Sequence, residues 1–223
     1  MTDNSPILLC IAVLGGTGKE GSALAMRWAL NGYKVIIGSR DAEKAKARAA
    51  ELNAELGGDY LEGMDNVAAA TIGNVIVVSV PYSAHKDTLL SVKDKLAGKV
   101  VVDVTVPLMP PNIQKVHVPE GHAAALEAKA LLGDDVRLVS AFQHVSSSKL
   151  KKLNESVDCD VLVCGDDDDA KADVMKLVEA AGMRGVDAGS LANAVAVEAM
   201  GAVLLYINKK YGVKGTGIRI TGI

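Results

Sequence analysis

Cysteine, clustered positive charge and long apolar segments are all scarce in this 223-residue sequence. The three cysteines, Cys10, Cys159 and Cys164, are odd in number and lack C-x-x-C spacing, which argues against a disulfide framework and a zinc site. A net charge of -3, without a run of lysines and arginines, argues against a nucleic-acid partner. The apolar run at residues 7–14 is too short to span a membrane, and its flanks are wrong for a signal peptide. We therefore expect a cytoplasmic protein that binds small molecules.

What the sequence does contain is an alternation of short apolar runs with longer amphipathic segments, in a chain that is 49% hydrophobic and 23% charged. This alternation predicts βαβ units and an α/β fold with a doubly wound, mainly parallel sheet of the Rossmann type. The predicted strands cover residues 7–14, 34–38, 74–81, 99–107 and 136–142, and the predicted helices cover residues 19–31, 42–56, 83–96 and 191–211, with a further strand and helix over 160–183 and a loop over 107–118.

A glycine cluster separates the first predicted strand from the first predicted helix. Gly16, Gly18 and Gly21 fit the pattern G-x-G-x-x-G. In that pattern the first glycine permits a tight turn, the second lets a pyrophosphate approach the backbone, and the third lets the helix pack on the strand. The amides of Thr17 to Glu20 would face the phosphates at the positive end of the helix. We therefore favour a dinucleotide site over a purely structural glycine turn.

The second predicted strand ends on a serine and an arginine, at the place where the adenosine ribose of a dinucleotide would lie. A carboxylate there would bind a ribose 2′-hydroxyl and repel a 2′-phosphate. Instead the chain has Ser39 and Arg40, and Lys44 follows at the start of the next helix. A guanidinium can form paired hydrogen bonds to phosphate, so these residues together favour NADP over NAD. For either cation taken alone, we would favour a solvated surface position.

Other parts of the pocket follow from topology, because ligands of an open α/β sheet bind outside the carboxyl ends of its strands. Val80, Pro81 and Tyr82 follow one buried run, and Val106 follows the next. We expect these residues to wall the pyrophosphate and the nicotinamide ribose. The alternative is that the prolines only end strands.

At this point the sequence resembles the NADPH-dependent reductases of the deazaflavin coenzyme F420. The resemblance runs over nearly the whole chain. It rests on "VLGGTGKEG", "GSR" with Lys44, "VSAFQHVSS", "VCGDD", "DAGSLANA" and "YGVKGTGI". It implies an NADP-binding Rossmann domain over residues 1–142, a small C-terminal α/β extension over residues 143–223, and a deazaflavin cleft between the two. It also implies a homodimer.

The resemblance further implies which residues bind each cofactor. The NADP contacts would be Thr17, Gly18, Lys19, Glu20, Ser39, Arg40 and Lys44, with Val80, Val106 and Ser147 on the nicotinamide side. The deazaflavin cleft would be lined by Gln143, His144, Val145 and Leu205. One place departs from the family pattern, because members have a histidine where Gln143 stands and a proline where Ser146 stands, and His144 comes one residue later.

The sequence shows no evident nucleophile with its base. Hydride transfer between C4 of a nicotinamide and C5 of a deazaflavin needs none, because the cofactors carry the reaction and the protein orients two rings. We therefore predict NADP and coenzyme F420 as cofactors, a reversible hydride transfer, and no catalytic side chain. Two alternatives stay open: an NADP-dependent reductase of a small imine, keto acid or chelated metal, and an NADP-sensing protein without turnover. The short segment after Phe142 counts against the first, since such dehydrogenases append a larger helical domain.

The remaining polar clusters fit structural roles. Residues Asp166 to Asp169 follow a predicted strand, and carboxylates favour the N-terminus of the next helix, so we expect no metal there. Glu198 lies in an apolar helix, where we expect a backbone or interface partner. His85 would either approach the pocket or face solvent.

Overall fold

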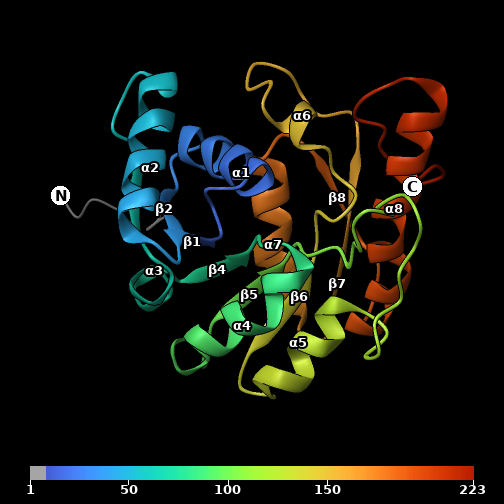
Figure 1. The fold of residues 1–223 in the computed structure, drawn as a ribbon, viewed down its shortest axis with the longest axis horizontal. Coiled ribbons are helices and arrows are strands. Elements are labelled where there is room, and N and C mark those ends of the chain that lie inside the picture. The colour runs from blue at the N-terminus through green and yellow to red at the C-terminus, as the bar shows by residue number, and fades with distance from the viewer. Residues whose placement is uncertain (1–8) are drawn as a thin grey trace.

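The structure, a computed structural model, describes residues 9–223, so the first two residues of the predicted strand at 7–14 lie outside the described residues. Within this range one eight-stranded sheet has the order β3-β2-β1-β4-β5-β6-β7-β8 (Figure 1). The strands are β1 (Cys10–Leu14), β2 (Lys34–Ser39), β3 (Leu61–Asp65), β4 (Val75–Val78), β5 (Val100–Asp103), β6 (Arg137–Ser140), β7 (Asp160–Gly165) and β8 (Arg184–Asp187). Every neighbouring pair is parallel except β6 and β7, which are antiparallel.

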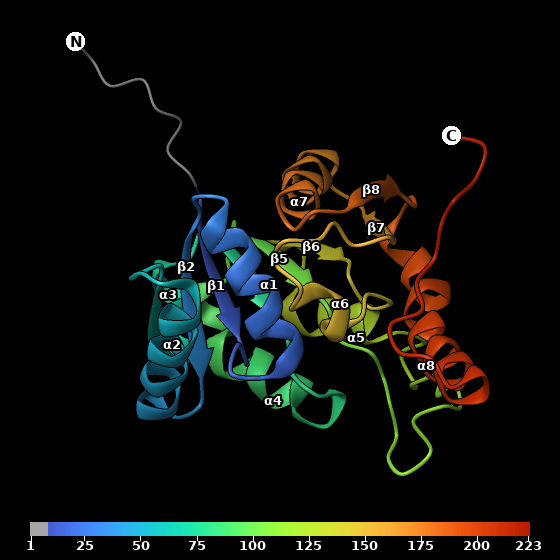
Figure 2. The same ribbon diagram turned by 90° about the horizontal axis from the view of Figure 1, so that it is seen from above.

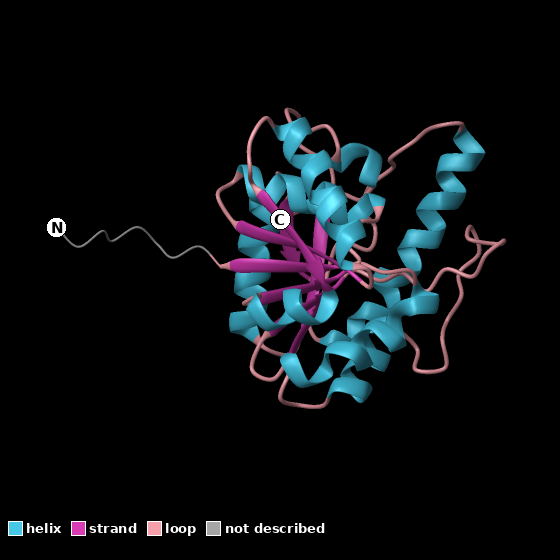
Figure 3. Ribbon diagram, turned by 60° about the vertical axis from the view of Figure 1, so that its left-hand side comes forward, coloured by secondary structure: helices cyan, strands magenta, loops and turns pink. Residues whose placement is uncertain are grey.

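Helices cover both faces of the sheet (Figure 3). The helices are α1 (Lys19–Leu30), α2 (Ala42–Leu56), α3 (Asn66–Ile72), α4 (Tyr82–Val92), α5 (Ala124–Leu132), α6 (Ser147–Leu150), α7 (Asp168–Ala180) and α8 (Ala194–Tyr211), with 3₁₀ turns at Lys93–Lys95 and Leu191–Asn193. Alternate residues of β1 contribute to the two layers: Ile11 and Val13 pack with α1, α2 and α7, whereas Ala12 and Leu14 pack with α3, α4 and α5. Burial on both faces explains why the central strands read as unbroken apolar runs.

Over the first hundred residues, the sequence predicted β1, α1, β2, α2, β4, α4 and the start of β5 in the right order. The predicted helix at 42–56 coincides with α2, whose ends carry the expected signals, since Asp41 accepts from the amides of Glu43 and Lys44 and Gly57 follows with a φ of 74°. The predicted helix at 83–96 is α4 followed by a 3₁₀ turn. The predictions omitted β3, α3, α5, α6 and β8. Because β6 and β7 pair, the sheet is continuous across residue 142, and the two-part division of the chain stays a prediction.

The last helix, α8, lies beside the loop that leaves β5, as Figures 1 and 2 both show. Gly201 permits this approach, because a Cβ at that position would lie 2.9 Å from Val106 Cγ1 and 3.2 Å from the carbonyl oxygen of Gln143. Among the described residues, Leu191–Tyr211 is the one segment long and apolar enough by composition to cross a membrane. One face of this segment is buried against the rest of the chain, so in this structure the segment packs as a helix of the folded protein.

Candidate cofactor-binding site

The glycine loop joins the end of β1 to the start of α1. A Cβ on Gly16 would lie 2.7 Å from the carbonyl oxygen of Val13, and a Cβ on Gly21 would lie 3.0 Å from Gly16 Cα. Packing within the protein therefore requires glycine at both positions. At Gly18, by contrast, the nearest atom to a Cβ would be the carbonyl oxygen of Gly15 at 3.4 Å. Gly18 is exposed and is the N-cap of α1, so its missing side chain leaves open space above the helix end, as an approaching phosphate needs.

Two residues that the sequence analysis missed shape this loop. Gly15 has a φ of 72°, so the left-handed residue of this tight turn is Gly15, one position before the glycine that was predicted to permit the turn. The Ser22 hydroxyl donates to the carbonyl oxygen of Gly16 at 2.8 Å and accepts from Arg48 Nε at 3.2 Å. This pair of hydrogen bonds ties the loop to α1 and α2. A serine directly after the last motif glycine was the only sequence signal for it.

The basic residues lie at the carboxyl end of β2, near the glycine loop. Ser39 is buried, and its hydroxyl accepts from the Asp41 amide at 3.3 Å. Arg40 and Lys44 are exposed, and neither forms an ion pair within residues 9–223. Their neighbour Lys46 is instead paired with Glu43 at 2.8 Å. Two unpaired cations beside the end of β2 fit a 2′-phosphate better than a bare ribose hydroxyl.

A cavity of about 300 Å³ opens beside the glycine loop. Of the predicted NADP residues, this cavity brings together Gly18, Lys19 and Glu20 of the loop with Val80, Pro81 and Val106 at the ends of β4 and β5. Its lining comprises Gly18, Lys19, Glu20, Ser79, Val80, Pro81, Val104, Val106, Leu108, Phe142, Gln143 and Val145. Strand ends far apart in the sequence meet here, and the role of Val80, Pro81 and Val106 in binding NADP stays a prediction. Thr17 does not line this cavity.

Tyr82 lies elsewhere, and its side chain does not reach this cavity. Its hydroxyl donates to Glu127 Oε2 at 2.8 Å, and its ring stacks on that of His85 in a groove between α4 and α5. Burial, together with the Glu127 carboxylate, raises the pKa of Tyr82 to about 12. As the first residue of α4, Tyr82 follows the helix away from the strand end. We therefore leave Tyr82 out of the NADP site.

A second cavity, of about 240 Å³, lies between the β6–α6 segment and α8. It gathers the four predicted deazaflavin residues, Gln143, His144, Val145 and Leu205, together with the predicted Ser147. Residues from the β5 loop, α8 and the C-terminal tail complete it, and the sequence analysis missed them. These are Leu108, Gly201, Leu204, Asn208 and Thr216.

Two side chains of this second cavity have a polar atom without a partner. Gln143 Nε2 donates to the carbonyl oxygen of Asp103 and to Ser140 Oγ, both at 2.7 Å, while its Oε1 atom has no partner in the described structure. His144 Nε2 lies 2.8 Å from the carbonyl oxygen of Asp160, so Nε2 carries the proton and the unpartnered Nδ1 is an acceptor. Burial lowers the pKa of His144 and keeps the ring neutral. The cavity thus has two buried acceptors available to a ligand.

A buried polar cluster attaches α8 to the rest of the protein. His85 Nε2 lies 2.7 Å from Asp103 Oδ2. Burial lowers the pKa of His85, but the Asp103 carboxylate outweighs this and the net direction is upward. Glu198 accepts from the first amides of α5, those of Ala124 and Ala125, at 2.7 and 2.9 Å. The prediction of a backbone partner for Glu198 is therefore confirmed, and His85 faces neither solvent nor the cofactor cavities.

Arg27 performs a similar attachment for α1. It is 5% exposed, and its guanidinium donates to the carbonyl oxygens of Leu150, Ala181, Lys152 and Glu155 at 2.7 to 3.0 Å. The helix that begins at the glycine loop is thereby fixed to α6 and the loop after it.

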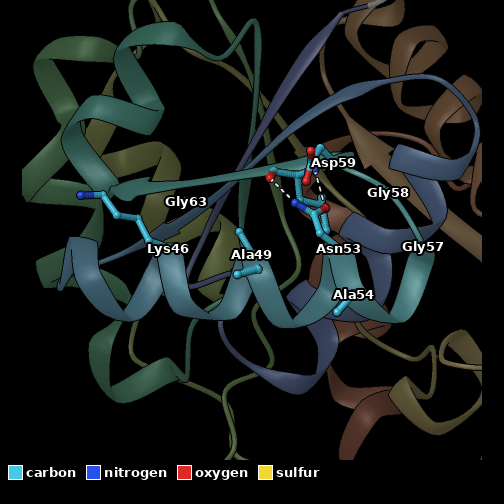
Figure 4. Close-up of a pocket in the computed structure, with 10 residues that line it drawn as sticks. Lys46, Ala49, Asn53, Ala54, Gly57, Gly58, Asp59 and Gly63 are labelled. Carbon is cyan, nitrogen blue, oxygen red and sulfur yellow. Dashed lines mark hydrogen bonds between the residues drawn. The ribbon is translucent and has the colours of Figure 1, made fainter.

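Another hollow, a groove of about 580 Å³, runs between α2 and β3 (Figure 4). Asn53, which lines the groove, accepts from the amides of Tyr60 and Leu61 and donates to the carbonyl oxygen of Leu61. Lys46, at one end of the groove, is paired with Glu43. Asn53 thus stabilises the edge of the sheet, and Lys46 is paired within α2, so both polar groups already have partners.

The acidic run after β7 also has structural partners. Asp167 accepts from the Ala170 amide at 2.8 Å at the N-terminus of α7 and forms a bidentate pair with Arg137. These contacts hold the pKa of Asp167 well below its usual range, the Arg137 guanidinium most strongly. Asp166 accepts from the Leu191 amide. The helix-terminus interpretation of this run is confirmed. Within residues 9–223 no group of three or more histidine, cysteine, aspartate or glutamate side chains could hold a metal ion.

Known proteins share both the sequence and the fold. Residues 10–107 match the family described as NADP oxidoreductase coenzyme F420-dependent. The F420-dependent NADP reductase of Methanocaldococcus jannaschii is 40% identical over 222 residues, covering 96% of this chain and 98% of that protein. This chain belongs to the same family. The F420-dependent NADP reductase of Methanothermobacter thermautotrophicus is 38% identical, with 97% of each chain covered. A solved structure from Arthrobacter sp. FB24, regarded as an F420-dependent NADP-reductase, has the same fold, with a TM-score of 0.82, 24% identity, and 95% and 99% of the two chains covered.

Proposed function

We propose that this protein transfers a hydride, reversibly, between NADP(H) and the deazaflavin coenzyme F420. The observation that carries the proposal is the shared wall of the two cavities, to which Glu20, Val106, Leu108, Gln143 and Val145 all belong. One cavity begins at the glycine loop, and the other is closed by α8. The two cavities therefore adjoin, and a planar ring bound in each would lie next to the other, as direct hydride transfer requires.

The chain's own residues would bind and orient the two rings and exclude water from them. In the NADP site, Thr17, Gly18 and Lys19 would hold the pyrophosphate, and Ser39, Arg40 and Lys44 the 2′-phosphate. Val80, Pro81, Val106 and Ser147 would flank the nicotinamide. In the deazaflavin cleft, Gln143 and His144 offer acceptors for an imide N–H, beside Val145 and Leu205. The bound cofactors supply the hydride donor and acceptor. No described residue is needed as a catalytic acid or base.

We also propose that a second copy of the chain covers the outer face of α8. Val195, Val203 and Tyr206 are exposed there, and Tyr206 is 54% exposed. Their spacing makes one apolar stripe along the helix that walls the deazaflavin cleft. The cysteines Cys10, Cys159 and Cys164 are buried and unpaired, which supports the cytoplasm as the location. Light scattering on the purified protein tests the dimer, and a monomer at working concentration would contradict it.

A spectrophotometric assay with NADPH and oxidised coenzyme F420 tests the function. We expect bleaching of the deazaflavin absorbance with NADPH, and much less with NADH or with FMN as acceptor. Folded protein that binds NADPH without bleaching the deazaflavin would contradict the proposal and favour an NADP sensor. Oxidation of NADPH by an imine, a keto acid or a chelated metal, but not by the deazaflavin, would favour the other alternative.

A further inference from the structure

Glu20 is the acidic side chain that lines both cavities. It lies in the first turn of α1, two residues beyond the N-cap Gly18. Its Oε1 atom is closed off from solvent and has no hydrogen-bond partner among residues 9–223. A buried polar atom without a partner is rare in folded proteins and calls for an explanation. Here the atom lies at the wall that the two cavities share.

The surroundings keep this carboxyl neutral. Burial alone raises the pKa of Glu20 to about 8. The other titratable side chains that line the cavities are Lys19, which is exposed, and His144, whose ring is neutral. A neutral carboxyl is also what the site requires, because a carboxylate beside the glycine loop would repel a pyrophosphate.

We propose that Glu20 binds the amide-type edge of a reacting ring, as a neutral carboxylic acid that donates one hydrogen bond and accepts another. A carboxylic acid and an amide are complementary, since the acid O–H meets the amide carbonyl and the amide N–H meets the acid carbonyl. This inference rests on the proposed function and deepens it. Two sources could supply the group: the carboxamide of the nicotinamide, or the pyrimidine-dione edge of the deazaflavin.

A purely structural role does not account for the side chain. Acidic residues stabilise helix N-termini by accepting from first-turn amides, as Asp41 does for α2. In α1 the N-cap has no side-chain hydrogen bond, and Glu20 Oε1 accepts from no amide. A leucine would fill the same space without leaving a polar atom unpaired. The unpartnered carboxyl oxygen therefore points to a ligand.

Binding titrations of two variants test the proposal and identify the source. Glu20→Leu removes both hydrogen bonds, Glu20→Gln keeps a donor and an acceptor without an ionisable proton, and Glu179→Gln, on the exposed side of α7, is the matched control. The ligands are NADPH, 2′,5′-ADP, which lacks the nicotinamide, and oxidised coenzyme F420. We expect Glu20→Leu to weaken one ring-bearing ligand by about tenfold and to leave 2′,5′-ADP unchanged. Weaker NADPH binding identifies the nicotinamide, and weaker F420 binding alone identifies the deazaflavin. Unchanged binding of both by Glu20→Leu would overturn the proposal.

The pH dependence separates a neutral acid from an ordinary carboxylate. In the wild type, the dissociation constant of the affected ligand should rise by about tenfold in all as the pH rises past about 8, because ionised Glu20 has no proton to donate. In Glu20→Gln it should stay flat. A readout without ligand is the infrared C=O stretching band of a protonated carboxyl at about pH 7, which Glu20→Gln should diminish and Glu179→Gln should not. If the wild-type spectrum minus the Glu20→Gln spectrum shows no such band, the proposal is overturned. Glu20-dependent NADPH binding in a protein that never reduces F420 would instead refute the proposed function alone.

Discussion

Replacing Gly18 with alanine should separate cofactor binding from stability. The N-cap backbone of α1 has φ -73° and ψ 167°, an extended conformation that alanine adopts without strain. The added Cβ would be 3.4 Å from the nearest protein atom, an ordinary contact. We therefore expect the free energy of unfolding to change by no more than about 0.5 kcal/mol. The same methyl group would occupy the space through which a pyrophosphate approaches, so the dissociation constant for NADPH should rise by at least about tenfold, or about 1.4 kcal/mol.

Gly16→Ala is the matched control, because it adds the same methyl group two residues earlier. There the Cβ would lie 2.7 Å from the Val13 carbonyl oxygen, which is closer than real Cβ contacts. The Gly16 amide also donates to the carbonyl oxygens of Val13 and Gly38, so the backbone is held in place there. The backbone must shift, at a cost of about 1–3 kcal/mol in unfolding free energy. Thermal melts and NADPH fluorescence titrations on both variants measure the contrast. Equal destabilisation by both substitutions, or wild-type NADPH affinity in Gly18→Ala, would refute the assignment of the loop.

Three further predictions concern other parts of the site. Arg40→Ala combined with Lys44→Ala should weaken NADPH binding by about 1–3 kcal/mol and leave NADH binding unchanged, whereas Lys46→Ala should alter neither; titrations with both nucleotides check this, and an intact preference for NADPH would remove the two cations from the site. Arg27→Met should lower the unfolding free energy by about 3 kcal/mol in urea melts, because it leaves buried carbonyl oxygens unpaired, and a change below about 1 kcal/mol would contradict the attachment. Burial raises the pKa of Glu198 to about 7, above its unfolded value, so the wild type should lose about 2–3 kcal/mol of stability as pH rises from about 4.5 to about 7, and Glu198→Gln should lack this slope in urea melts across that window.

Much of the fold could be predicted because the central strands are buried on both faces. Their apolar runs are unmistakable, and helices such as α2 carry caps at both ends. The edge of the sheet gave weaker signals. In β3, "LEGMD", Gly63 lowers strand propensity, yet a Cβ there would lie 2.4 Å from the Ala45 carbonyl, so close packing of α2 requires the glycine. The antiparallel direction of β7 could not be predicted, because an alternation of strands and helices in the sequence does not show which way a strand runs.

The site divides in the same way between local and long-range information. The glycine loop and the residues at the ends of β4 and β5 follow from a local motif and from topology. Leu204, Asn208 and Thr216 could not be found that way, because they reach the second cavity through the packing of α8 against the β5 loop. Tyr82 shows the limit of the topological rule, since its position was right and its side-chain direction was not. The unpaired oxygen of Glu20 could not be predicted from the sequence either, because its burial depends on how distant segments pack around it.

Transfer of a labelled hydride tests the central claim most directly. NADPH carrying deuterium at both C4 positions of the nicotinamide would be mixed with the protein and oxidised coenzyme F420 in ordinary water, and the reduced deazaflavin would be analysed by mass spectrometry. Two rings that meet at the shared wall should pass the deuterium directly, so the product should carry one deuterium at C5. A reduced deazaflavin that carries only protium at C5 would contradict the account.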